Sequence, residues 1–298
     1  MHRASAIGRL LMLWAAVLSV GLAVTSCSQN DNEVESVEPI FVRLMREMPE
    51  ARYFLFYDLD VTEVAFPKEK TDKGVYRLPY GDLRELLNLP PEWEKELRAI
   101  IPERSRGFFV KVWEFSGPAA YPDFYSVLYP KAWDIKRFEA LLKKNGFTSR
   151  KEESSVLWAG MGHSGYSAIP IQLRISPQRI CLGNFDAAGS VTSNRNFEQL
   201  PRAKELARLM YPDAYNINID TPSSINSIFG ETHEGFALAI RGNMRLDAVL
   251  NSYADEETAG RAQSWHVRKS PSKKGPVQKG RILIWETKEP LRAKDGGK

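Results

Sequence analysis

The amino-acid sequence predicts an α+β fold, with a mostly antiparallel sheet and helices packed on one face. Segments such as 168–175 alternate apolar and polar residues, which is typical of antiparallel strands with one face in water. Amphipathic helical segments such as 134–145 are interspersed irregularly among them, which argues against a helical bundle or a β-sandwich. A strand followed by a helix at 123–145 and again at 235–253 leaves open two similar subdomains.

The helices are predicted from apolar stripes at helical spacing. The clearest is 134–145, where Asp134 can cap the first turn and Gly146 can end the helix. Further helices are expected at 91–101, 202–210 and 246–253. Strands are expected at 53–58, 107–115, 123–129, 168–175, 178–182, 215–220, 235–240 and 281–287.

The first 26 residues have the three parts of a secretory signal peptide. A cationic start is followed by an apolar run over 10–24 and by small residues before a possible cleavage site. This run has 15 residues, fewer than the roughly 20 that a membrane-spanning helix needs. We therefore expect cleavage and not a permanent anchor helix.

The residues Val24-Thr25-Ser26-Cys27 resemble the lipobox of bacterial lipoprotein precursors. The resemblance implies that Cys27 receives the lipid and becomes the first residue of the mature protein. Ser28 after it favours the outer membrane facing the periplasm over the inner membrane. The alternative is ordinary secretion, because Val24 and Ser26 also suit the common signal peptidase. Lipid on Cys27 would leave Cys181 without a disulfide partner.

Composition divides the chain into four parts. The signal peptide covers 1–26, and an acidic, flexible tether without basic residues covers 27–38. An α+β subdomain is expected at 39–190, and a second α+β part at 191–298 ends in a basic tail. Pro and Gly interrupt the basic residues of this tail, so they cannot form one basic face. No nucleic-acid partner is expected.

An apolar strand runs into Asp58-Leu-Asp60-Val-Thr62. This Asp-x-Asp-x-Thr pattern resembles the first motif of haloacid dehalogenase-type phosphatases. The resemblance implies that Asp58 is the nucleophile, that Asp60 is the general acid, and that Mg²⁺ neutralises the phosphate. The later acidic pair for the metal is not found, and half-polar strands differ from the parallel sheet of that family. A strand that ends in a polar turn is the favoured interpretation.

Other motifs point to structure and not to chemistry. Gly160-Met-Gly162-His-Ser-Gly165 matches the dinucleotide-binding pattern, but a strand follows where a helix is required. A glycine-rich hairpin loop is therefore expected. The histidines after the leader share no ligand spacing, so no metal or cofactor is predicted. The aromatic residues between 108 and 133 form either core or a stacking platform for flat ligands such as sugars.

These observations predict a non-catalytic binding or interaction module of the bacterial cell envelope. The lipid on Cys27 would hold it to the membrane, and its partner would be an envelope protein or polysaccharide. The alternative is an envelope hydrolase, a metal-dependent phosphatase that uses Asp58 and Asp60.

Overall fold

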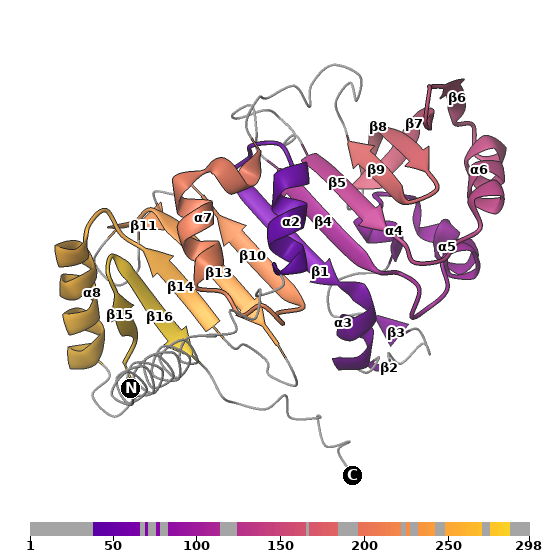
Figure 1. Ribbon diagram of the computed structural model, residues 1–298. Coiled ribbons are helices and arrows are strands. Elements are labelled where there is room, and N and C mark those ends of the chain that lie inside the picture. Colours follow the sequence, from indigo (N-terminus) through magenta and orange to yellow (C-terminus); the bar gives the residue numbers. More distant parts are fainter. Residues whose placement is uncertain are drawn as a thin grey trace, which may run out of the picture. The chain divides into compact units, whose positions relative to one another are not determined.

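A twelve-stranded sheet forms the centre of the structure, which is a computed structural model (Figure 1). The structure describes residues 38–65, 69–70, 76–77, 83–113, 124–164, 167–183, 196–221, 225–226, 232–241, 248–269 and 275–286. The predicted signal peptide, Cys27 and the end of the basic tail lie outside these residues. Contacts group residues from Pro39 to Lys298 into one compact unit. No helix within the described ranges is both long and apolar enough to cross a bilayer.

Every pair of neighbouring strands in the large sheet is antiparallel, with the order β15-β16-β14-β13-β10-β1-β4-β5-β9-β8-β7-β6. Its strands are β1 (Tyr53–Asp58), β4 (Phe108–Trp113), β5 (Phe124–Tyr129), β6 (Thr148–Lys151), β7 (Val156–Ser164), β8 (Ser167–Ser176), β9 (Arg179–Gly183), β10 (Asn216–Asp220), β13 (Gly235–Ile240), β14 (Ala248–Ser252), β15 (Val277–Lys279) and β16 (Ile282–Glu286). Two small antiparallel pairs join β2 (Glu69–Lys70) to β3 (Tyr76–Arg77) and β11 (Ile225–Asn226) to β12 (Thr232–His233).

The helical segments are mostly short. They are α2 (Ile40–Glu47), α3 (Leu59–Ala65), α4 (Leu83–Leu86), η1 (Pro91–Trp93), α5 (Glu94–Ile100), α6 (Ile135–Lys144), η2 (Phe197–Gln199), α7 (Pro201–Arg208) and α8 (Glu256–Lys269). Helix α6 begins as predicted, because the Asp134 carboxylate accepts the backbone N–H of Arg137 at 3.0 Å. It ends before Gly146, whose φ of +82° favours glycine. Helices α2 and α8 were not predicted.

The predicted α+β class with an antiparallel sheet is confirmed. The helix predicted at 246–253 is wrong, because this segment contains strand β14. Its apolar residues fit both periods, and pairing with β13 and β16 on its two sides decides for the strand. Ala248 and Leu250 then point into the core. The strand-then-helix echo of 123–145 is therefore absent from 235–253.

Helices lie on both faces of the sheet, and not on one face as expected. On the first face, α2 and α7 pack on alternate residues of the central strands, among them Phe54 and Phe56 (Figure 1). On the second face, α4, α5 and α6 pack on the intervening residues, such as Tyr57 and Phe109. Helix α8 also contacts this face, through Leu283 of β16. The central strands carry large apolar side chains on both faces of the sheet, so both faces must be buried by helices.

The two predicted parts, 39–190 and 191–298, each supply one half of the same sheet. The halves meet where β1 pairs with β10, from Tyr53 opposite Asp220 to Tyr57 opposite Asn216. The helices cross this junction as well, because α2 of the first part packs against η2 of the second. The described residues on the two sides of position 190 therefore share one core.

Candidate functional site

Asp58 stands at the C-terminal end of β1 and caps helix α3. Its Oδ1 accepts the backbone N–H of Val61 at 3.0 Å, and the Thr62 hydroxyl donates to its carbonyl oxygen at 2.6 Å. Burial raises the pKa of the Asp58 carboxyl, although the bond from Val61 opposes this effect. The Asp-x-Asp-x-Thr pattern thus forms a strand-to-helix turn that is stabilised by hydrogen bonds between its own residues.

Asp60 binds the backbone of a different segment. Its Oδ1 accepts the N–H groups of Arg106 and Gly107 at 3.1 and 3.2 Å, and the Lys131 ammonium lies 2.5 Å from its Oδ2. Gly107 has a φ of +63°, and a Cβ there would lie 2.1 Å from the Tyr129 carbonyl oxygen. Asp60 therefore fastens this tight turn, which opens β4, to the start of α3.

These contacts bear on the phosphatase resemblance. It implies a parallel sheet, whereas β1 lies between two antiparallel neighbours, β10 and β4. Among the described residues, no group of three or more His, Cys, Asp or Glu could hold a metal ion. Both carboxylates bind backbone N–H groups instead. The catalytic role of Asp58 and Asp60 stays a prediction, and the contacts that the structure shows are structural.

Gly160 and Gly162 of the glycine-rich segment lie within strand β7, whereas Gly165 lies outside the described residues. A Cβ at Gly160 would lie 2.5 Å from the Phe147 ring, and one at Gly162 would lie 2.5 Å from the Asn88 carbonyl oxygen. The same carbonyl accepts the N–H of His163 at 2.7 Å. The glycines thus allow close packing against the strand, and the expected hairpin is formed by β7 and β8.

The described aromatic residues between 108 and 133 divide between the two faces of the sheet. Tyr125 and Tyr129 lie on the first face, where the Tyr129 hydroxyl donates to Glu47 at 2.6 Å. Arg179 donates to the same carboxylate at 3.2 Å. Burial raises the pKa of both tyrosines and of the Cys181 thiol. The bonds from Tyr129 and Arg179 to Glu47 link α2 to the sheet, which favours packing over a ligand platform on this face.

On the second face, a lysine lies among apolar side chains. Lys111 of β4 stands opposite Leu55 of β1 and Ser126 of β5. Its Nζ lies 4.8 Å from the ring centroid of Phe124, and burial lowers its pKa. Among the described residues, no carboxylate pairs with this ammonium, and burial is the cause of its lowered pKa. The lone lysine in the run Phe108–Trp113 was the sequence signal, and the sequence analysis missed it.

Two polar side chains near Lys111 also lack partners within the described part of the chain. Ser126 is 1% exposed and its Oγ has no hydrogen-bond partner. Asn218 of β10 stands opposite Leu55, and its buried Oδ1 also has no hydrogen-bond partner among the described residues. We use the name Lys111 patch for the following residues on this face: Lys111, Ser126, Asn218, Tyr53, Leu55, Trp113 and Phe124.

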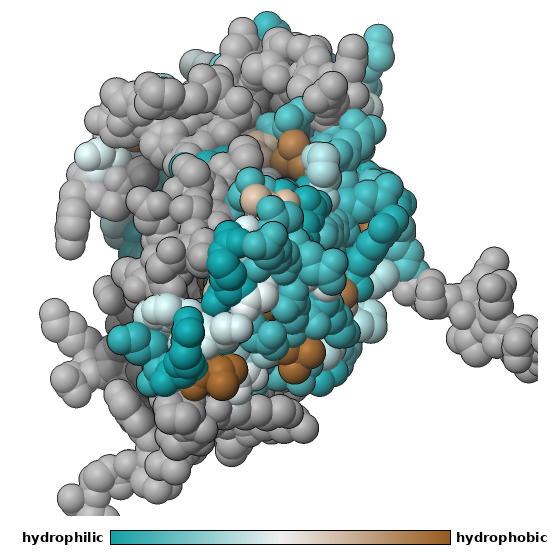
Figure 2. Space-filling model, turned by 90° about the vertical axis from the view of Figure 1, so that its left-hand side faces the viewer, coloured by the Kyte–Doolittle hydropathy of each residue, from teal (hydrophilic) through white to brown (hydrophobic). Residues whose placement is uncertain are grey.

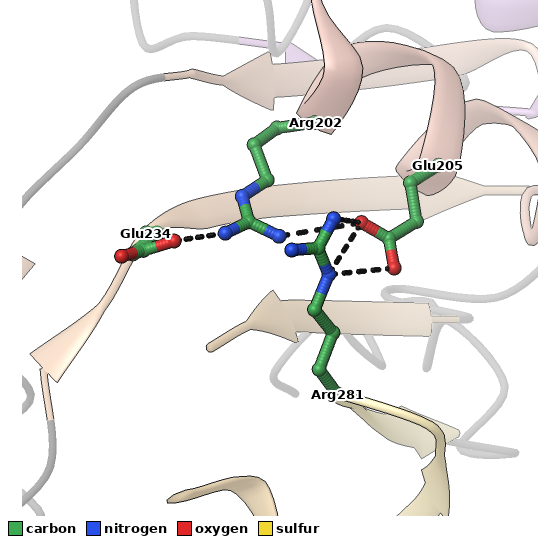
Figure 3. A network of polar contacts seen from close by, with 4 residues as sticks. All are labelled: Arg202, Glu205, Glu234 and Arg281. Atoms are coloured by element: carbon green, nitrogen blue, oxygen red, sulfur yellow. Dashed lines mark hydrogen bonds and ion pairs between the residues drawn. The ribbon is translucent and has the colours of Figure 1, made fainter. Parts of the chain in front are cut away.

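A second polar cluster ties helix α7 to the sheet (Figure 3). Arg281, just before β16, donates from Nε to both Glu205 oxygens at 2.9 Å. Arg202 bonds to Glu205 at 3.4 Å and also pairs with Glu234, just before β13. The bond from Arg281 lowers the pKa of Glu205. Each of these four side chains pairs with a side chain of opposite charge, so we infer that the cluster has a structural role.

Two further surfaces give less support for a binding site. A hollow of about 460 Å³ lies between the end of α5 and the start of α6, lined mainly by apolar atoms of Ile100, Trp133 and Ile135. Figure 2 looks onto the α8 end of the sheet, where most of the described residues are hydrophilic and the hydrophobic ones are scattered. Val267 and Val277 are exposed at this end. Scattered apolar residues of this kind are normal on a protein surface.

Comparison with known proteins identifies a similar solved structure. No family model matches the chain, and no curated protein matches it. A solved structure titled "Structure of crystal form I of TP0453" is similar, with a TM-score of 0.49 and 11% sequence identity. The likeness covers 84% of this chain and 92% of that chain. At this level of similarity, it carries no argument about function.

Proposed function

We propose that the chain is a lipid-anchored lipoprotein of the bacterial cell envelope and that it acts as a non-catalytic binding module. One observation carries the non-catalytic part. The carboxylates of Asp58 and Asp60, in the pattern that most resembles a catalytic motif, bind backbone N–H groups within the fold. The Lys111 patch supports a binding role, because it holds polar groups that lack partners among the described residues.

The anchor is proposed at Cys27, within the lipobox-like leader. Each methylene of a buried acyl chain contributes about 0.8 kcal/mol, so several chains on one residue hold a protein firmly on a bilayer. The acidic segment 27–38 is proposed as a flexible tether between the lipid and the remainder of the chain. We place the protein at the outer membrane, facing the periplasm, with an envelope protein or polysaccharide as its partner.

Metabolic labelling with an alkyne fatty acid tests the anchor. We expect label on the wild type and on Cys181→Ala, which removes the buried cysteine, and none on Cys27→Ala. Label that persists in Cys27→Ala would refute the anchor. An unlabelled wild type that is recovered in the periplasmic fraction would instead support ordinary secretion.

The second candidate is the envelope phosphatase. The observation in its favour is the Lys131 ammonium, which lies 2.5 Å from Asp60, because this chemistry needs a cation near the acidic pair. Turnover of an aryl phosphate with Mg²⁺ by the wild type, lost in Asp58→Asn, would replace the binding module with this enzyme. We expect the wild type and the variant to be equally inactive.

A further inference from the structure

The ammonium of Lys111 occupies an unfavourable position for a structural cation. It lies on a largely apolar stretch of the sheet, and the Phe124 ring is its neighbour there. A partly buried ammonium without a carboxylate loses hydration that a single cation–π contact only partly replaces. Other described lysines differ, because Lys131 and Lys144 pair with Asp60 and Glu96 and have exposed side chains.

The neighbouring polar atoms can complete an anion site. Lys111 and Ser126 are directly opposed on neighbouring antiparallel strands, which places their Cβ atoms about 5 Å apart. The Ser126 hydroxyl, which has no partner within the described part of the chain, can donate to the same anion as the ammonium. Two adjacent donors, one of them charged, suit an acidic oxygen group.

Apolar groups surround these donors. Leu55 stands opposite Lys111 on β1, and Trp113 lies two residues farther along β4 on the same face. The Trp113 ring stacks on Tyr53 with centroids 4.9 Å apart. Leu55, Trp113 and Tyr53 are all partly exposed. A ligand on this surface would meet an apolar floor beside the two donors.

We infer that the Lys111 patch binds a small organic anion, an acidic group carried on an apolar or aromatic body. The acidic group accepts hydrogen bonds from Lys111 and Ser126, and the body covers Leu55 and Trp113. Asn218 Oδ1 can accept a hydrogen bond from a hydroxyl or N–H group on the same ligand. This inference rests on the proposed function of the chain as a binding module and names the class of ligand.

Calorimetry on the full-length lipidated protein in uncharged detergent micelles tests the site. The probes are 2-naphthoate and its neutral analogue 2-naphthalenemethanol, with empty micelles as the blank. We expect naphthoate to bind at least about tenfold more tightly than the alcohol, because only naphthoate pairs with the ammonium. Equal affinities of the wild type for the two probes would overturn the inference.

The variants Lys111→Met and Lys143→Met make a matched pair, since Lys143 is exposed on α6. Lys111→Met should weaken naphthoate binding about tenfold and leave the alcohol unchanged, whereas Lys143→Met should alter neither. Ser126→Ala, which removes only a hydroxyl, should weaken naphthoate binding about threefold and serves if Lys111→Met does not fold. Unchanged naphthoate affinity in Lys111→Met or in Ser126→Ala would refute the site.

Thermal unfolding distinguishes a binding lysine from a structural one. Without ligand, Lys111→Met should unfold at a higher temperature than the wild type, because methionine removes a desolvated charge. Naphthoate should raise the midpoint of the wild type more than that of Lys111→Met. A lower midpoint for Lys111→Met would show that the ammonium is structural. The fatty-acid label reports only on Cys27, so failure of the anchor and failure of this site are told apart.

Discussion

At the scale of single residues, two aspartates that both cap helices have pKa values shifted in opposite directions. Asp58 and Asp255 both cap a helix, since each accepts a backbone N–H three residues ahead. Asp58 is partly buried, and burial raises its pKa. Asp255 is exposed, and the bond from the Thr258 N–H lowers its pKa. Capping alone therefore does not decide how such a carboxylate titrates.

The capping role of Asp58 predicts different costs for two substitutions. Asp58→Ala should lower the free energy of unfolding by about 1 kcal/mol, because the N–H of Val61 loses its acceptor. Asp58→Asn should cost only a few tenths of that, since the amide oxygen also accepts this bond. Urea unfolding followed by circular dichroism measures both. Equal losses in the two variants would contradict the cap.

The opposite pKa shifts predict opposite pH dependence. The contribution of Asp58 to stability is fully present below its ordinary pKa and is lost as pH rises through the raised folded value. The contribution of Asp255 is present above its ordinary pKa and is lost as pH falls through the lowered value. From pH 3 to 7, Asp58→Asn should gain stability relative to the wild type and Asp255→Asn should lose it. Urea midpoints across this range check both signs.

At the scale of elements, close approach between a strand and a loop explains the glycines of β7. Gly162→Ala should lower the free energy of unfolding by about 2–3 kcal/mol, because its Cβ would meet the rigid Asn88 carbonyl. The matched control is Gly260→Ala on α8, where the nearest atom to the added Cβ is 3.6 Å away. There alanine should stabilise the helix by about 0.5–1 kcal/mol. Chemical denaturation measures both changes, and an unaffected Gly162→Ala would disprove the close packing.

The attachment of α7 to the sheet depends on Glu205. Glu205→Gln should lower the free energy of unfolding by about 1 kcal/mol, because the charge-assisted bonds from Arg281 and Arg202 weaken. The pKa of Glu205 is lowered, so its contribution is present above the ordinary pKa and is lost as pH falls. Glu257→Gln, in an exposed pair with Arg261 on α8, should change stability little. A similar loss in both variants would contradict the role of the cluster.

At the scale of the whole molecule, the pairing of β1 with β10 joins the two halves of the sheet. The core on the first face also spans the halves, since Phe54 stacks on Phe197 with centroids 5.0 Å apart. A fragment of either half alone would expose these side chains and an unpaired strand edge. The two halves therefore depend on each other for burial.

This dependence predicts a single cooperative unfolding transition for the described core. Hydrogen exchange of β4 and β14, which belong to different halves, should report the same opening free energy. Fragments 39–190 and 191–298, expressed separately, should show no cooperative thermal transition. A cooperative transition in either fragment would instead establish an independent domain boundary near residue 190.

Local sequence signals identified several elements with correct bounds. The bounds of β1 and β13 match their predicted ranges, and Asp134 caps α6 as expected. The Lys111 patch could not be derived in the same way. Its members come from β1, β4, β5 and β10, and only the register between these strands brings them together.

Periodicity and helix caps act over a few neighbouring residues, so they were sufficient to predict the α+β class, the antiparallel sheet and the capped helix α6. The signal peptide at 1–26 and the lipid on Cys27 stay predictions from the sequence. The strand at 248–252 and the helices on both faces of the sheet depend on contacts between distant segments. Periodicity shows which side of an element is apolar, whereas distant segments supply the partner that buries it.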